Sequence, residues 1–152
     1  MSLSKIQIAF LSVIWIVLDF LTKNMVENKS YIITHSLHLR LAREYPKFDL
    51  ISQFSPYSMQ IAIGGSILSL IIMGYFYTQY FHRIILVSIG MVMAGIIGNL
   101  IDKLYFGWAR VFIDFHHPKL LMFFDTPQFP LFNLADILIV WGALIFIFNK
   151  KW

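Results

Sequence analysis

The stretch IILVSIGMVMAGIIGNLIDKL, Ile84–Leu104, is apolar over the length of a membrane crossing and carries charge only near its end. Crossing a hydrocarbon core takes about 20 mostly apolar residues, each adding about 1.5 Å of helix. Three other runs have the same character. The sequence therefore predicts four membrane helices, at about 6–26, 59–81, 84–104 and 131–148.

The composition agrees with a membrane protein. Of the 152 residues, 59% are hydrophobic and only 13% are charged, and the mean hydropathy is +0.72. These values lie far from those of an ordinary soluble domain. We therefore expect an all-α integral membrane protein that forms one domain over residues 1–152.

Two polar segments, at about 27–58 and 105–130, separate the predicted helices on one side of the membrane. Within them, residues 31–33, 37–41 and 110–114 alternate between apolar and polar side chains, as short strands do. We expect a small β cradle on the face opposite both termini. The density of Lys and Arg close to the helix ends favours cytoplasmic termini, which places this cradle on the periplasmic side.

Charge, cysteine content and histidine spacing exclude several classes of function. The net charge of +4 comes from Lys and Arg spread between apolar runs, so nucleic acid is not an expected partner. The chain has no cysteine, which excludes disulfides and thiolate nucleophiles. The histidines lack the spacing of a metal site, and we expect neither a metal nor a cofactor.

Two opposite charges lie inside the first predicted helix. Asp19 and Lys23 are four positions apart, so they share one face of that helix. An internal ion pair costs less in hydrocarbon than either charge alone. The pair either holds the helix in register or organises a functional site nearby, and the sequence leaves both interpretations open.

The third predicted helix carries a polar stripe. Gly95, Asn99 and Asp102 follow an i, i+4, i+7 spacing and therefore lie along one face. Asn and Asp side chains need polar partners within a membrane, so this stripe should face other helices. Lys103, next to it, could extend its ammonium group to the lipid headgroups.

Asp114 and Asp136 are the strongest candidates for catalytic residues. Asp136 stands at the start of the last apolar run, and Asp114 lies close to another run. Two carboxyls within hydrogen-bonding reach cannot easily both ionise, so one can act as a base towards water while the other polarises a peptide carbonyl. Helix capping is the alternative for an isolated aspartate, and spacing alone does not bring the two together.

Three motifs, together with Asp19 and Lys23, resemble bacterial lipoprotein signal peptidase, also called signal peptidase II. The motifs are Gly98-Asn99-Leu100-Ile101-Asp102-Lys103, Val111-Phe112-Ile113-Asp114-Phe115 and Phe129-Pro130-Leu131-Phe132-Asn133-Leu134-Ala135-Asp136. The resemblance covers the four predicted helices in order and nearly the whole chain.

The resemblance implies an intramembrane aspartic endopeptidase of the bacterial inner membrane, with four spanning helices and an active site at the periplasmic side. Such an enzyme removes signal peptides from diacylglyceryl-modified lipoprotein precursors in contact with membrane lipid, and globomycin blocks the same site. Asp114 and Asp136 would form the catalytic pair. Supporting or substrate-binding roles would fall to Asp19, Lys23, Asn99, Asp102, Lys103 and Asn133. We expect a monomer.

Two departures from the family pattern concern substrate handling. The first long loop reads Arg43-Glu44-Tyr45-Pro46-Lys47-Phe48-Asp49, where the family usually has Asn-x-Gly-x-Ala-Phe. Lys103 stands where the family commonly has Arg, which loses the planar fork of the guanidinium. The altered first loop keeps open a non-hydrolytic homologue that binds lipidated or hydrophobic peptides, whereas the change at Lys103 alone need not abolish catalysis. A small transport or assembly subunit with buried carboxylates is a third possibility.

Overall fold

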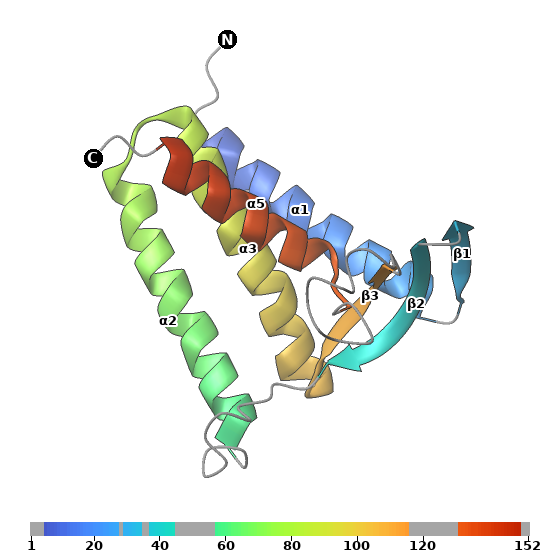
Figure 1. Ribbon diagram of the computed structural model, residues 1–152. Helices are drawn as coiled ribbons and strands as arrows, with labels where there is room; N and C mark the ends of the chain where they lie inside the picture. Colours follow the sequence, from blue (N-terminus) through green and yellow to red (C-terminus); the bar gives the residue numbers. More distant parts are fainter. Residues whose placement is uncertain (1–4, 28, 35–36, 45–56, 116–130, 150–152) are drawn as a thin grey trace.

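The computed structural model describes residues 5–27, 29–34, 37–44, 57–115 and 131–149. The chain runs through α1 (Lys5–Val26), β1 (Tyr31–Thr34), β2 (Leu37–Glu44), α2 (Ser58–Gln79), α3 (Arg83–Phe106), β3 (Ala109–Phe115) and α5 (Leu134–Asn149). The helices form a bundle, and the strands lie at the end of that bundle opposite the turn between α2 and α3 (Figure 1).

Helix α3 is the centre of the bundle and packs against α1, α2 and α5. Glycines allow the close approach of these helices. A Cβ added to Gly142 of α5 would lie 2.7 Å from the carbonyl oxygen of Ser88 on α3, and one added to Gly90 of α3 would lie 2.6 Å from Ser12 Oγ on α1. Small residues at such positions are the usual means of packing membrane helices, because dispersion contacts replace the hydrophobic effect there.

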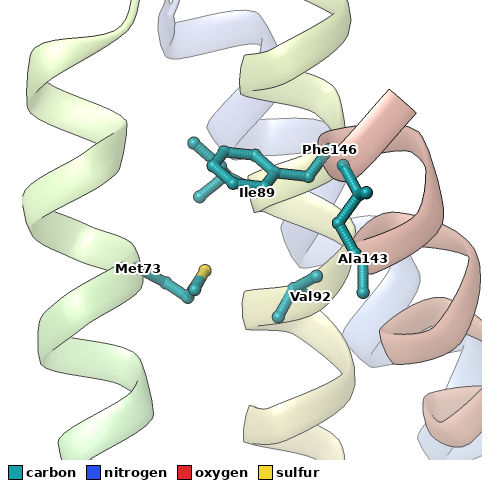
Figure 2. A pocket seen from close by; sticks show the side chains of 6 residues that line it. Met73, Ile89, Val92, Ala143 and Phe146 are labelled. Carbon is teal, nitrogen blue, oxygen red and sulfur yellow. The ribbon is translucent and has the colours of Figure 1, made fainter. Parts of the chain in front are cut away.

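Helix α2 leans away from the other three (Figure 1). None of its residues, all of which the structure describes, is buried. Its last turn is fixed to the start of α1, because Lys5 Nζ donates to the carbonyl oxygens of Tyr77 and Thr78, each at 3.2 Å. An apolar pocket of about 150 Å³ lies between α2, α3 and α5 and is lined by Met73, Ile89, Val92, Ala143, Phe146 and Ile147. Figure 2 shows it from close by.

The three strands form one antiparallel sheet in the order β1-β2-β3, so the predicted β element is confirmed. Glu44 of β2 pairs with Ala109 of β3, and His38 pairs with Asp114. A bulge lies in β2 between Leu39 and Ala42. The sheet thus fixes which end of β2 lies beside each end of β3.

The prediction of four membrane crossings is confirmed in part. In the part of the chain that the structure describes, α1, α2 and α3 are long and apolar enough to cross a membrane. Helix α5 is apolar but has 16 residues, and it begins at Leu134 rather than at 131. Its start is delayed because Phe132 exchanges backbone hydrogen bonds with Ile113 of β3. At ~1.5 Å per residue, α5 extends about 24 Å, less than a typical hydrocarbon core of about 30 Å.

Candidate functional site

The first component of the site is an ion pair between α3 and β3. Asp102 and Arg110 are both almost fully buried. Arg110 Nε and Nη2 donate to Asp102 Oδ1 at 3.0 and 2.9 Å, and the backbone N–H of Arg110 donates to Oδ2 at 3.0 Å. Several donors from one residue on one carboxylate give geometric specificity as well as energy. This contact fixes the start of β3 against the last turns of α3.

The predicted pair of Asp19 and Lys23 joins the same carboxylate from α1. Lys23 Nζ lies 2.6 Å from Asp19 Oδ2 and 2.9 Å from Asp102 Oδ2, and all three side chains are buried. With Arg110 included, two cations face two carboxylates, so the buried charges balance. Such balance is required because an isolated buried charge is very costly.

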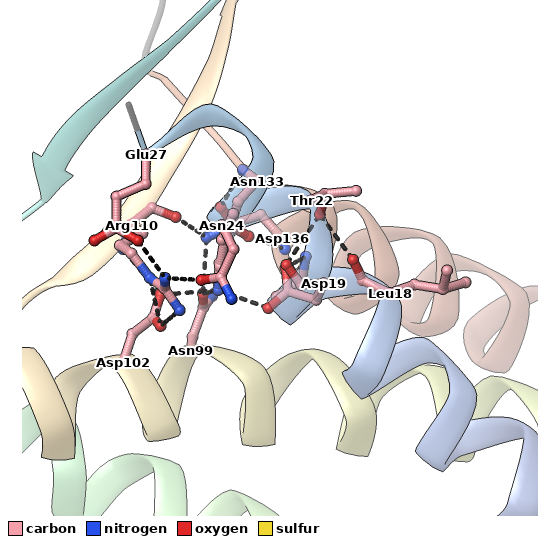
Figure 3. A network of polar contacts seen from close by, with 12 residues as sticks. Leu18, Asp19, Thr22, Asn24, Glu27, Asn99, Asp102, Arg110, Asn133 and Asp136 are labelled. Carbon is pink, nitrogen blue, oxygen red and sulfur yellow. Dashed lines mark hydrogen bonds and ion pairs between the residues drawn. The ribbon is translucent and has the colours of Figure 1, made fainter. Parts of the chain in front are cut away.

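Two asparagines extend this network to the start of α5 (Figure 3). Asn99 Oδ1 accepts from Lys23 Nζ at 3.3 Å and from Asn133 Nδ2 at 2.8 Å. Asn133 Nδ2 also donates to the carbonyl oxygen of Arg110 at 2.9 Å. The stripe predicted on the third helix therefore does face other elements, and Asn133 connects α3, β3 and α5.

Asp136 lies in a reciprocal cap at the start of α5. Its backbone N–H donates to Asn133 Oδ1 at 2.9 Å, and its Oδ2 accepts from the backbone N–H of Asn133 at 2.9 Å. This is the geometry of a capping box. The other carboxylate oxygen accepts from Asn99 Nδ2 at 2.7 Å. Asp136 is only half-buried, so its carboxylate is rigidly held and still accessible.

A neighbouring N–H of α5 is capped from another helix. The backbone N–H of Ala135 donates to Asp19 Oδ1 at 2.9 Å, across from α1. A carboxylate near a helix N-terminus is favoured by the helix dipole as well as by the hydrogen bond. Asp19 therefore bridges Lys23 and α5, which joins the predicted first-helix pair to the candidate site.

Asp114 lies on β3 and is buried, with its carboxylate in an ion pair with Arg40 Nε of β2. The Arg40 side chain is half-exposed. The bridge between Ile113 and Phe132 brings the residue before Asp114 against the segment that leads into α5. Asp114 and Asp136 thus belong to adjoining segments, although four residues of β3 separate Asp114 from Ala109 at the other end of the strand.

The charges of the site also affect the pKa of one further carboxyl, that of Glu44. Partial burial raises the pKa of Glu44, the negative charge of Asp136 raises it further, and Lys103 acts in the opposite direction. Glu44 ends β2 and lies opposite Ala109 in the sheet. It belongs to the loop segment in which the sequence departs from the family pattern, and residues 45–49 of that segment lie outside the described residues.

The structure gathers most of the predicted site residues into one network. Hydrogen bonds and ion pairs join Asp19, Lys23, Asn99, Asp102, Asn133 and Asp136. Lys103 is half-buried beside this network. Sequence reasoning missed Arg110 and Arg40 as ion-pair partners. An arginine within an apolar strand, as in Ala109-Arg110-Val111-Phe112, was the available signal for the first.

No metal site is visible in the described ranges, where no group of three or more His, Cys, Asp or Glu side chains could hold an ion. The charged and polar side chains of the site are carboxylates, amides, an ammonium group and guanidinium groups.

Comparison with known proteins identifies the family. A sequence model described as signal peptidase (SPase) II matches residues 11–150. The chain belongs to the signal peptidase II family. A lipoprotein signal peptidase of Wigglesworthia glossinidia brevipalpis is 31% identical over 142 residues, covering 88% of this chain and 87% of that relative. One from Burkholderia cenocepacia is 36% identical over 69 residues, covering 45% of this chain and 37% of that relative.

Solved structures agree with the family. A bacterial membrane enzyme structure obtained by the in meso method at 2.3 Å resolution superimposes with a TM-score of 0.73 at 26% sequence identity. The similarity covers 97% of this chain and 91% of that one. A second such structure, at 1.9 Å resolution, has a TM-score of 0.75. The chain is thus an integral membrane protein with the fold of a bacterial membrane enzyme.

Proposed function

We propose that this protease of the signal peptidase II family removes signal peptides from lipoprotein precursors by an aspartic mechanism, with Asp114 and Asp136 as the catalytic pair. The observation that carries the proposal is the family match over residues 11–150. It is supported by the Asp136 carboxylate, which is held by two N–H donors and remains accessible at the end of the bundle.

The chemistry requires one carboxylate as base and one proton donor. The base takes a proton from a water molecule as that water attacks the peptide carbonyl, and the donor protonates the carbonyl oxygen. When the tetrahedral intermediate collapses and its carbon–nitrogen bond breaks, the base gives the proton taken from water to the leaving amine, and the donor recovers a proton from a hydroxyl of the intermediate. Water is consumed, and a carboxyl and an amine form.

The remaining polar residues position the pair. Asn99 and Asn133 fix the carboxylate of Asp136 through their N–H groups. Behind them, Lys23 holds Asp19 and Asp102 together, so that α1, α3 and α5 keep one geometry. A rigid supporting layer of this kind keeps catalytic groups within reach of the reacting atoms.

The proposal includes the location and partners of the enzyme. The chain would lie in the bacterial inner membrane with the sheet on the periplasmic side, because the lysines near its helix ends favour cytoplasmic termini. Its substrates would be diacylglyceryl-modified precursors reached through the surrounding lipid. It would bind globomycin at the same site and act as a monomer.

Cleavage of a diacylglyceryl-modified precursor by the purified chain in lipid tests this function. The parent should release the signal peptide, while Asp114→Asn and Asp136→Asn should each lower the rate by at least about 100-fold. Unfolding in detergent must show that both variants fold. Cleavage by both variants at the parent's rate would contradict the aspartic mechanism.

A non-hydrolytic homologue is the second candidate, favoured by the structural roles of both aspartates. Asp114 is ion-paired with Arg40, and Asp136 belongs to a capping box. Such a protein would bind lipidated or hydrophobic peptides without cutting them. Saturable binding of the precursor by a folded parent that yields no product would support it, and turnover that depends on Asp136 would exclude it.

A further inference from the structure

The net positive charge of the chain comes from parts of the sequence that hold no acidic residue. No Asp or Glu occurs in residues 1–18, 50–101 and 137–152. The basic residues of these ranges are Lys5, Arg83, Lys150 and Lys151. These four account for the net charge of +4, because the other eight Lys and Arg are matched by eight Asp and Glu. Lys5 and Arg83 begin α1 and α3, at the end of the bundle opposite the strands (Figure 1).

An apolar groove of about 200 Å³ lies between α1, α2 and α3. Its wall on α1 includes Ala9, Ser12 and Ile16, which follow Lys5 by four, seven and eleven positions. Residues with this spacing lie along one face of a helix. Ala9 is exposed, so the groove is open at the surface of the bundle. Lys5 therefore stands at the head of the helix face that forms this wall.

The wall of the groove on α3 has the same relation to Arg83. Gly90, Ala94 and Ile97 follow Arg83 by seven, eleven and fourteen positions and therefore share its face of the helix. The Arg83 side chain is exposed. From Arg83 to Ile97 the helix rises about 21 Å at ~1.5 Å per residue, whereas half of a hydrocarbon core is about 15 Å. The groove thus covers the depth of one membrane leaflet below a cation on each side.

The last turn of α2 joins the groove to Lys5. Tyr77 lines the groove, and its hydroxyl donates to the carbonyl oxygen of Lys5 at 2.6 Å. Lys5 Nζ donates to the carbonyl oxygens of Tyr77 and Thr78 and lies 4.2 Å from the centre of the Phe81 ring. Among the described residues, no carboxylate forms an ion pair with Lys5 or Arg83. The charges of both cations are therefore left for an anion from outside the chain.

We propose that this groove binds an acyl chain of one anionic phospholipid, whose phosphate group lies between Lys5 and Arg83. The apolar walls accept the chain, and the two cations select an anionic headgroup over a zwitterionic one. Basic pockets between membrane helices bind anionic lipids in this way. The bound lipid would also hold α2, which has no buried residue, against α1 and α3. The site is separate from the proposed catalytic residues and does not rest on the proposed function.

Native mass spectrometry of the purified chain measures this binding, with phosphatidylglycerol and phosphatidylcholine of the same acyl chains added to the micelles. The parent should retain one phosphatidylglycerol, with a Kd at least about 10-fold below that for phosphatidylcholine. Lys5→Gln and Arg83→Gln should each raise the Kd for phosphatidylglycerol about 5-fold, and Lys5→Arg should bind as the parent does. Lys29→Gln, which removes an exposed cation next to β1, is the matched control and should leave this Kd unchanged. Equal binding of the two lipids by the parent, or equal losses in Lys5→Gln and Lys29→Gln, would overturn the proposal.

Two further measurements in the same assay test the groove itself. Ala9→Phe places a ring in the groove and should raise the Kd for both lipids at least about 10-fold, because the acyl chain loses its apolar contacts. Ile6→Phe, at an exposed position of α1 outside the groove, should bind as the parent does. Glycerol phosphate, which carries the anionic group without acyl chains, should not displace the lipid. Unchanged binding in Ala9→Phe would place the lipid elsewhere, and displacement by glycerol phosphate would show a site for a free anion, so either result would refute the proposal.

Discussion

Replacing Lys23 with Met should destabilise the bundle severely. The ammonium group is fully buried and serves three acceptors, Asp19 at 2.6 Å, Asp102 at 2.9 Å and Asn99 at 3.3 Å. Methionine fills much of the same space without charge. The variant therefore leaves two buried carboxylates with one buried cation.

The size of the effect follows from which charge loses its partner. Asp102 keeps the guanidinium of Arg110 at 2.9 Å, whereas among the described residues the Asp19 carboxylate keeps only the N–H of Ala135. Removing one partner of a buried ion pair typically costs about 3–5 kcal/mol. We expect Lys23→Met to lower the free energy of unfolding by that amount. Adding Asp19→Asn restores charge balance, and the double variant should recover at least about 1 kcal/mol.

Reversible unfolding of the purified chain in mixed micelles, with increasing sodium dodecyl sulfate, measures these differences. Lys103→Met is the matched control, because Lys103 is only half-buried at the end of α3. The free energy of unfolding of this variant should differ from that of the parent by less than about 0.5 kcal/mol. The reasoning would be refuted if Lys23→Met were as stable as the parent. It would also be refuted if Asp19→Asn added a further loss to Lys23→Met.

Two further predictions concern packing and pH. Gly98→Ala would place its Cβ 2.6 Å from Asp19 Oδ2, and the ion pair with Lys23 prevents Asp19 from moving away. The free energy of unfolding of this variant should therefore fall by about 1–3 kcal/mol in the same micelle assay. Gly64→Ala, where a Cβ meets nothing within 4 Å, should be close to neutral, and equal losses in the two variants would contradict the packing argument. Because the pKa of Glu44 is raised in the folded chain, its contribution to stability is present below its unfolded pKa. That contribution is lost as pH rises through the folded pKa, so the stability of the parent relative to Glu44→Gln should fall over this range. A difference that stays constant or grows with pH would exclude a raised pKa.

Patterns local in the chain predicted much of the fold. The positions of α1, α2 and α3 followed from the length of the apolar runs, and the strands followed from alternation over 31–33, 37–41 and 110–114. The pairing of Asp19 with Lys23 followed from their four-residue spacing on one helix. In each case the deciding interactions lie within a few residues along the chain.

The start of α5 was misplaced because its limit comes from outside the helix. The apolar run around Leu131 and Phe132 has the composition of a membrane helix. Its backbone instead bonds to Ile113, and the capping box between Asn133 and Asp136 begins the helix at Leu134. Composition cannot show that the backbone of a segment will form hydrogen bonds with a neighbouring strand instead of continuing a helix.

The sequence by itself determined that this is a membrane protein of the signal peptidase II family, where its long helices lie, and which polar residues must find partners within them. Only the tertiary structure decided which partners they find. Arg110, rather than its neighbour in the sequence Lys103, pairs with Asp102. Arg40 pairs with Asp114 from 74 residues away, and the negative charge of Asp136 helps to raise the pKa of Glu44. Apolar length and periodicity are properties of a segment. Pairing between charges far apart in the chain depends instead on strand register and helix packing, which bring those segments together.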